Sequence, residues 1–187
     1  MKKVVLTFGL IAGAILSILM VITMAVTKSI GVEKLGMEAS MAIGYTTMIL
    51  SFILVYFGIR SYRDNVLGGT VRFWPALRVG LLIALIASIC YSATWQVVYR
   101  VMLPNYATEY AAEAVRKAEA KGASPAELAT MRTDMAEFVE AYKNPVYNFA
   151  MTLLEPSPVG VLFALISAGL LSRKRRQAVS SLGTAVS

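Results

Sequence analysis

Three long stretches without a charged residue, and a fourth interrupted by a single acid, dominate this sequence. A helix rises about 1.5 Å per residue, so about 20 apolar residues are needed to cross the hydrocarbon core of a bilayer. Each stretch is long enough to do so. The sequence therefore predicts four membrane-spanning helices, at about residues 4–26, 39–59, 79–99 and 146–171.

The composition excludes the other broad classes of protein. The chain has 187 residues, of which 57% are apolar and only 16% are charged. A soluble domain carries about 25% charged residues, and a disordered chain is far less apolar. We therefore expect one all-α membrane domain over residues 1–187, a four-span transmembrane helical bundle.

The amino terminus has an alternative interpretation as a cleaved signal peptide, because Lys2 and Lys3 precede its apolar run. The apolar core of a signal peptide spans only about 7 to 15 residues. The run from Val4 to Val26 is longer, and no cleavage site closes it cleanly before Lys28. We favour an uncleaved first span.

The basic residues are distributed unevenly between the loops, and this predicts the orientation. Loops that stay in the cytoplasm keep an excess of lysine and arginine. The amino terminus, the loop between spans 2 and 3 and the basic tail after span 4 form one set of segments, and its single acid is Asp64. Most other acids lie in the 101–144 segment. We expect a multi-pass protein of the cytoplasmic membrane, with both termini and the middle loop inside. The basic residues of that set are Lys2, Lys3, Arg60, Arg63, Arg72, Arg78, Arg173, Lys174, Arg175 and Arg176.

The 101–144 segment shows the signals of two helices. Residues 105–121 are rich in alanine, glutamate and lysine, and Gly122 then suits a helix end. Ser124, Pro125 and Glu127 form the pattern of a capping box with proline in the first turn. We expect an extracytoplasmic helical hairpin between spans 3 and 4, at about residues 105–143.

The second helix of this hairpin has an apolar stripe with two interpretations. Its members recur at three- and four-residue spacing, as one face of a helix does. We favour packing against the first helix, where Tyr106, Tyr110, Ala114 and Ala118 share a face, over docking of a protein partner. The hairpin nevertheless remains the element expected to face a partner. The stripe consists of Leu128, Met131, Met135, Phe138 and Tyr142.

Small residues recur at every fourth position in three of the predicted spans. Such faces let membrane helices approach closely and pack by dispersion. We favour packing within the bundle, and the alternative is a homo-oligomer that forms through Gly9 and Gly13. The candidate helix-packing residues are Gly9, Gly13, Gly80, Ala84, Gly160 and Ala164.

Glu155 is the one acid within a predicted span, and Pro156 and Pro158 follow it, so we expect a break at 155–158. A charged side chain at the bilayer centre costs about 2.5 to 3.5 kcal/mol even on the insertion scale. These three residues therefore form a candidate intramembrane polar site for a proton or cation, with Thr152 and Ser157 nearby. The alternative, which we favour, is that Glu155 caps a short final span and lies near the outer interface.

The loop between spans 2 and 3 combines arginines with aromatic residues and a Gly-Gly turn. Its arginines have the chemistry to bind anionic lipid headgroups, while its aromatics anchor at the interface. We favour the simpler interpretation, that the arginines set topology. A nucleic-acid role is not expected, because the inside rule explains the net charge of +7. The candidate residues are Arg60, Tyr62, Arg63, Asp64, Gly68, Gly69, Arg72 and Trp74.

The ordered segments resemble the bacterial integral-membrane family catalogued as domain of unknown function 4199. GIRSYRDNVLGG closes the second span, RFWPALRVGLLIALIASICY enters the third, and YKNPVYNFAMTLLEPSPVG precedes the fourth. The resemblance covers about residues 2–175, and YRD-x-x-x-GG and EPxPVG are its most specific parts. It implies a four-helix protein of the bacterial inner membrane with an extracytoplasmic helical loop. It implies no activity and no catalytic residues.

The sequence offers little for an enzyme. Without histidine, and with Cys90 as its one cysteine, the chain lacks the usual nucleophile pairs and metal ligands. We expect no catalytic centre, metal or cofactor. The leading hypothesis is a non-enzymatic scaffold or accessory subunit, and the alternative is a small oligomeric transporter or channel subunit that uses Glu155 as a proton or cation site.

Overall fold

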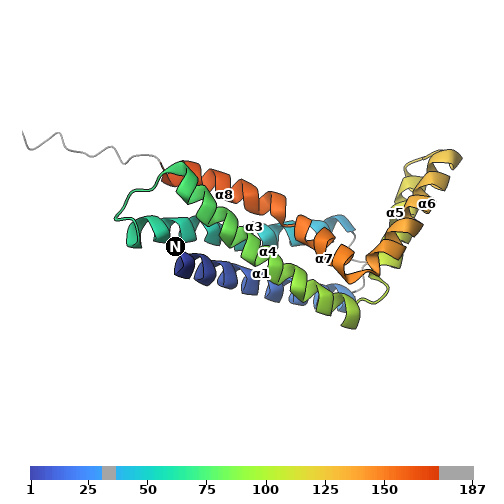
Figure 1. The fold of residues 1–187 in the computed structure, drawn as a ribbon. Coiled ribbons are helices and arrows are strands. Elements are labelled where there is room, and N and C mark those ends of the chain that lie inside the picture. The colour runs from blue at the N-terminus through green and yellow to red at the C-terminus, as the bar shows by residue number, and fades with distance from the viewer. Residues whose placement is uncertain (31–36, 173–187) are drawn as a thin grey trace, which may run out of the picture.

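The computed structural model describes residues 1–30 and 37–172 as a helical bundle with a two-helix arm at one end (Figure 1). The basic tail at 173–176 lies outside the described residues. The helices, in chain order, are α1 (Lys2–Ile30), α3 (Met37–Asn65), α4 (Phe73–Val101), α5 (Tyr106–Ala120), α6 (Pro125–Tyr142), α7 (Pro145–Leu154) and α8 (Ser157–Leu171).

Within residues 1–30 and 37–172, four segments have the length and hydropathy of membrane spans, as the sequence predicts. They are Lys2–Val26, Ala42–Asn65, Phe73–Val101 and Pro145–Leu171. The predicted ends of two spans differ from those of the helices. α3 continues past Arg60 to Asn65, and α4 begins before Arg78, at Phe73. The arginines mark where the hydrocarbon is expected to end, but a long arginine side chain on a helix reaches water without ending that helix.

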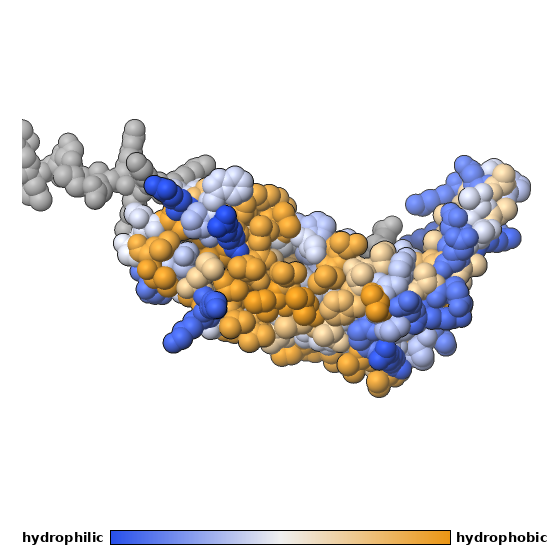
Figure 2. All heavy atoms as spheres, viewed as in Figure 1, coloured by the Kyte–Doolittle hydropathy of each residue, from blue (hydrophilic) through white to orange (hydrophobic). Residues whose placement is uncertain are grey.

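The bundle core lies where α1, α3 and α8 pack around α4. Its largest buried side chains include Leu16, Phe52, Ile59 and Ile83, each almost inaccessible to solvent. The outer surface of the same helices is also apolar, and it forms the belt that Figure 2 shows between hydrophilic ends. Apolar side chains on both the inside and the outside of a helix bundle are what a lipid environment requires.

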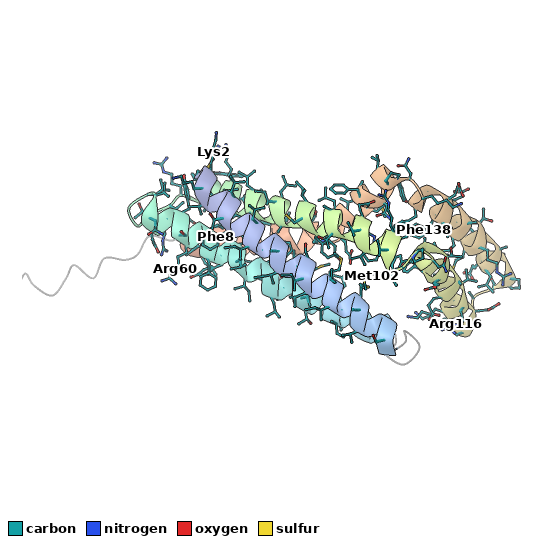
Figure 3. The ribbon with its side chains drawn as sticks, turned by 90° about the horizontal axis from the view of Figure 1, so that it is seen from below. Lys2, Phe8, Arg60, Met102, Arg116 and Phe138 are labelled. Carbon is teal, nitrogen blue, oxygen red and sulfur yellow. The ribbon has the colours of Figure 1, made fainter. Side chains whose placement is uncertain are left out.

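The two ends of the bundle differ in what they carry. Lys2 and Arg60 lie at one end, whereas Arg116 and Phe138 belong to the arm at the other (Figure 3). The turn between α3 and α4 uses Gly68 and Gly69, whose φ angles of 68° and 102° suit glycine. The two predicted basic segments that the structure describes thus share one end of the bundle.

The arm consists of α5 and α6, which pack against each other. Ser124 begins α6 with the predicted capping box: its hydroxyl accepts from the Glu127 amide, and the Glu127 carboxylate accepts from the Ser124 amide at 2.8 Å. Gly122 sits in the turn with φ 82°. In Figure 1 the arm leaves the bundle axis at a steep angle.

Candidate functional site

The arm joins the bundle through a cluster of aromatic side chains, here called the aromatic junction. Trp95 of α4 meets Tyr106 of α5 edge-on, with ring centroids 4.9 Å apart. Tyr142 at the end of α6 contacts Tyr99 at 5.3 Å. Such geometries are the favoured ones for aromatic pairs. The junction comprises Trp95, Tyr99, Tyr106, Tyr110, Phe138 and Tyr142.

A buried hydrogen bond locks this junction. The indole Nε1 of Trp95 donates to the Tyr142 hydroxyl oxygen at 2.9 Å. Burial raises the pKa of Tyr106 and also that of Tyr142, because an apolar environment disfavours the charged phenolate. The junction is therefore neutral and closely packed, which fixes the arm to α4. The rest of the predicted stripe on α6 is partly covered, with Phe138 against Tyr110 at 5.8 Å.

A second polar group lies beside the junction, where α7 packs on α4. The Gln96 Nε2 donates to the Asn148 Oδ1 at 2.7 Å, and the Thr152 hydroxyl donates to the Asn148 carbonyl oxygen at 2.8 Å. Asn148 is only 1% exposed, and its Nδ2 has no hydrogen-bond partner in the described part of the chain. A buried donor without an acceptor is rare in proteins.

Glu155 stands at the break between α7 and α8. Tyr91 of α4 donates its hydroxyl to the Glu155 Oε2 at 3.3 Å, and the carboxylate is otherwise exposed on the bundle surface. Glu155 lies ten residues after the first residue of α7, or about 15 Å along the span. That is about half of the ~30 Å hydrocarbon thickness.

The favoured interpretation of Glu155 as a cap for the final span is wrong. The N-cap of α8 is Pro156, which makes no side-chain capping bond, and Glu155 ends α7 in a helical conformation. The expected polar pocket is also differently built. The Thr152 and Ser157 hydroxyls donate to backbone carbonyls, that of Ser157 to Leu153 at 2.6 Å, and Tyr91 is the partner of the carboxylate instead.

The candidate loop residues gather at the opposite end of the bundle. Asp64 pairs with Arg63 at 2.7 Å and with Arg60 at 3.6 Å, so its charge is neutralised locally. Tyr62 packs against the core, whereas Trp74 is 68% exposed, as expected for an interfacial anchor. Arg72 is exposed next to it. This group is separate from Glu155, and the structure does not bring the two together.

The small-residue faces lie at helix contacts within the bundle. A Cβ on Gly9 would meet Ile86, and one on Gly13 would meet Cys90, both on α4. In the same way Gly80 lies against Ala164, and Gly160 against Ala84. The face formed by Gly9 and Gly13 is thus occupied by a helix of the same chain.

Nothing in the described ranges resembles a metal centre. Within residues 1–30 and 37–172, no three histidine, cysteine or acidic side chains lie close enough to hold a metal ion together. What the geometry offers is an arm tied to α4, a carboxylate within a candidate span, and a small group of amides on α4 and α7.

Comparison with known proteins places the chain in a family. The model of the family described as protein of unknown function (DUF4199) matches residues 7–173. The chain belongs to this family. The matched region of this DUF4199 member contains the arm, the last three spans and all of the first span except residues 2–6. The chain matches no curated protein and no solved structure.

The residues that sequence reasoning missed are Tyr91, Trp95, Gln96 and Asn148. All four are single polar or aromatic side chains inside apolar helices. Polar groups within membrane spans are uncommon, and that is the signal that was available for them. Their hydrogen-bond partners, however, lie between 47 and 64 residues away along the chain, so the sequence does not predict which residues pair.

Proposed function

We propose that this DUF4199 member is a non-enzymatic scaffold or accessory subunit of a bacterial cytoplasmic membrane, and that it binds a partner protein through its α5–α6 arm. The observation that carries the proposal is the aromatic junction. The hydrogen bond between Trp95 and Tyr142 ties the arm to α4, so a partner bound to the arm is held at a fixed position relative to the membrane.

The exposed face of α6 indicates the chemistry of the partner. Asp134 and Glu137 are exposed, and neither belongs to an ion pair within the described residues. The apolar stripe of α6 is partly buried, whereas this acidic face is exposed on the arm. A basic protein surface is its natural complement.

The orientation is part of the proposal. Both termini and the α3–α4 turn lie in the cytoplasm, and the arm lies on the opposite side, as the positive-inside rule favours. A reporter active only in the cytoplasm is expected to work when fused after Ser187 and to fail when inserted at Gly122. The reverse pattern refutes the orientation.

The partner is tested by crosslinking from defined positions in living cells. A photoreactive amino acid at position 134 or 137 is expected to yield the same adduct with one membrane or secreted protein, and Asp134→Lys with Glu137→Lys should abolish it. The matched control is the same photoreactive residue at position 74, exposed at the other end of the bundle. Adducts that are equal from all three positions, or none from the arm, would refute arm-mediated binding.

The Glu155 carboxylate favours a second candidate, a small oligomeric transporter or channel subunit. Ionisable groups within spans often mark proton or ion pathways, and the break at Pro156 and Pro158 adds open backbone at the same depth. Since one bundle of four spans is too slim to enclose a pathway, this function requires several copies.

Native mass and flux separate the two candidates. The purified chain is reconstituted in liposomes that carry a pH-sensitive dye, and its oligomeric mass is measured in detergent. Proton flux from an oligomer that disappears in Glu155→Gln supports transport and refutes the scaffold. A crosslinked complex without flux supports the scaffold, and the Asp64→Asn variant, which changes a carboxylate outside the break, controls for nonspecific leakage.

A further inference from the structure

An open depression of about 370 Å³ lies at the end of the bundle that carries the arm. The last two turns of α4 form one wall and the first two turns of α7 form the other. It is lined by Gln96, Arg100, Pro145, Val146 and Phe149. One wall thus carries a cation and an amide, while the other is apolar.

The polar wall carries a cation without an acidic partner, and an unsatisfied amide lies behind it. Arg100 is exposed and makes no ion pair in the described chain, whereas Arg116, Arg132 and Lys143 of the arm are each paired with a glutamate. Directly behind Gln96 lies Asn148, whose buried Nδ2 has no acceptor either. A charged donor and an unsatisfied buried amide beside one depression indicate a ligand rich in acceptor oxygens.

The surroundings indicate that this ligand also has an apolar part. Val146 lines the depression and is 75% exposed, and the residues that follow Gln96 and Arg100 in α4, Val97 and Val101, are 61% and 74% exposed. They belong to the ends of two membrane spans, at the level where hydrocarbon gives way to headgroups. A ligand with anionic oxygens above and acyl chains below matches both halves of the site.

We propose that this depression binds the phosphodiester headgroup of a membrane lipid in the leaflet that faces the arm. Arg100 pairs with the phosphate, the Gln96 amide, positioned by its hydrogen bond to the Asn148 Oδ1, supplies a neutral donor, and the acyl chains run along the exposed valines. Arginine suits this role because its planar guanidinium binds two phosphate oxygens at once.

A lipid fits better than a free phosphate ion, because free phosphate gains nothing from apolar walls. The site is independent of the proposed partner on the arm, whose acidic face lies elsewhere on α6.

The test uses the fluorescence of Trp95, which lies directly before Gln96 in α4. Trp74→Phe removes the other tryptophan of the chain. In detergent micelles, phosphatidylglycerol with brominated acyl chains is expected to quench Trp95 saturably, and brominated diacylglycerol with the same chains is expected not to. In this background, Arg100→Gln should weaken the apparent affinity about fivefold to tenfold, the usual size of one charge-assisted contact.

Two further variants make the result specific. Arg132→Gln removes the same charge from the arm, away from the depression, and should leave quenching unchanged. Asn148→Leu should weaken lipid binding too, and phosphatidylglycerol should then raise the melting temperature of the parent more than that of the variant. Circular dichroism verifies that each variant is folded.

Three outcomes overturn the proposal. Equal quenching of the parent and the Arg100→Gln variant shows that Arg100 does not contact the phosphate. Equal quenching by diacylglycerol shows that only acyl chains bind. Displacement of the lipid by millimolar inorganic phosphate shows that the site prefers the free anion.

Discussion

The contact of Gly160 with α4 makes a sharp prediction about what holds the bundle together. An alanine Cβ at this position would lie 2.9 Å from the Ala84 Cβ and 3.2 Å from two ring carbons of Phe52. Carbon atoms in good contact are about 3.5 to 4.0 Å apart. The Ala84 methyl has no torsion that moves it away, so α8 and α4 must separate. Gly160→Ala is therefore expected to destabilise the fold.

The magnitude follows from two opposing effects. Extra methylene groups in a packed core cost about 1 to 3 kcal/mol. Replacing glycine by alanine inside a helix stabilises that helix by up to about 1 kcal/mol. The net expectation is a loss of about 1 kcal/mol of unfolding free energy.

Gly169 provides the matched control within the same helix. A Cβ there would meet nothing within 4 Å, so Gly169→Ala keeps the gain in helix propensity without the clash. The difference between the two variants, about 2 kcal/mol, isolates the close contact. It corresponds to about a 30-fold difference in the unfolding equilibrium constant. The measurement is a titration with sodium dodecyl sulfate in mixed micelles, followed by circular dichroism.

A second substitution tests the cause. Ala84→Gly removes the methyl group that Gly160→Ala meets, so the double variant should recover most of the lost stability, whereas each single variant is destabilised. If Gly160→Ala proves as stable as Gly169→Ala, the close packing of α8 on α4 is refuted. If the double variant is no better than the single ones, the clash lies elsewhere.

Three other predictions concern the arm. Trp95→Phe removes the hydrogen bond to Tyr142 and should lower the free energy of unfolding by about 1 kcal/mol. Amide exchange should become faster throughout α5 and α6 and stay unchanged in α1. Unchanged exchange in α5 and α6 refutes the role of this bond. Burial raises the pKa of both Tyr106 and Tyr142 above 10.0. The stability that their neutral phenols provide is therefore complete below pH 10 and is lost as the pH rises through the raised pKa values. The near-ultraviolet circular dichroism signal of the junction should weaken above pH 10 and stay unchanged at neutral pH. The hydrogen bonds from Ser124 lower the pKa of Glu127 from 4.5. The stabilisation by the cap of α6 is therefore complete above pH 4.5 and is lost as the pH falls through the lowered pKa. Glu127→Gln should abolish this pH dependence, which is measured by amide exchange at the start of α6.

The bundle was predictable because its signals are local. An uncharged stretch is visible in the sequence without knowledge of its neighbours, and the same is true of the box formed by Ser124 and Glu127, which are three positions apart. The predicted ends were less accurate, because charge marks a boundary of the hydrocarbon and not of a helix. α4 therefore begins at Phe73, six residues before the predicted start.

The aromatic junction was not predictable, because it is assembled by tertiary packing. Trp95, Tyr106 and Tyr142 belong to three different helices, and each alone looks like an interfacial aromatic residue. The stripe on α6 was recognised, but its continuation through Tyr142 into the membrane span was not. Periodicity identifies an apolar face and does not identify what covers it.

Glu155 shows why one sequence pattern supports two structures. A carboxylate before two prolines suits the start of the second helix, but it also suits the end of the first, and the backbone decides between them. Glu155 has φ −59° and ψ −54° and so continues α7, and the N-cap position of α8 falls on Pro156. Its carboxylate lies on the bundle surface within the candidate span Pro145–Leu171, with Tyr91 as its hydrogen-bond donor. A single hydroxyl does not satisfy an ionised carboxylate in hydrocarbon, so this position needs either a proton or a polar group from a neighbouring molecule. The transporter candidate supplies a transported proton or cation, whereas the proposed scaffold binds its partner through the arm and requires no charge at Glu155, so Glu155→Gln separates the two.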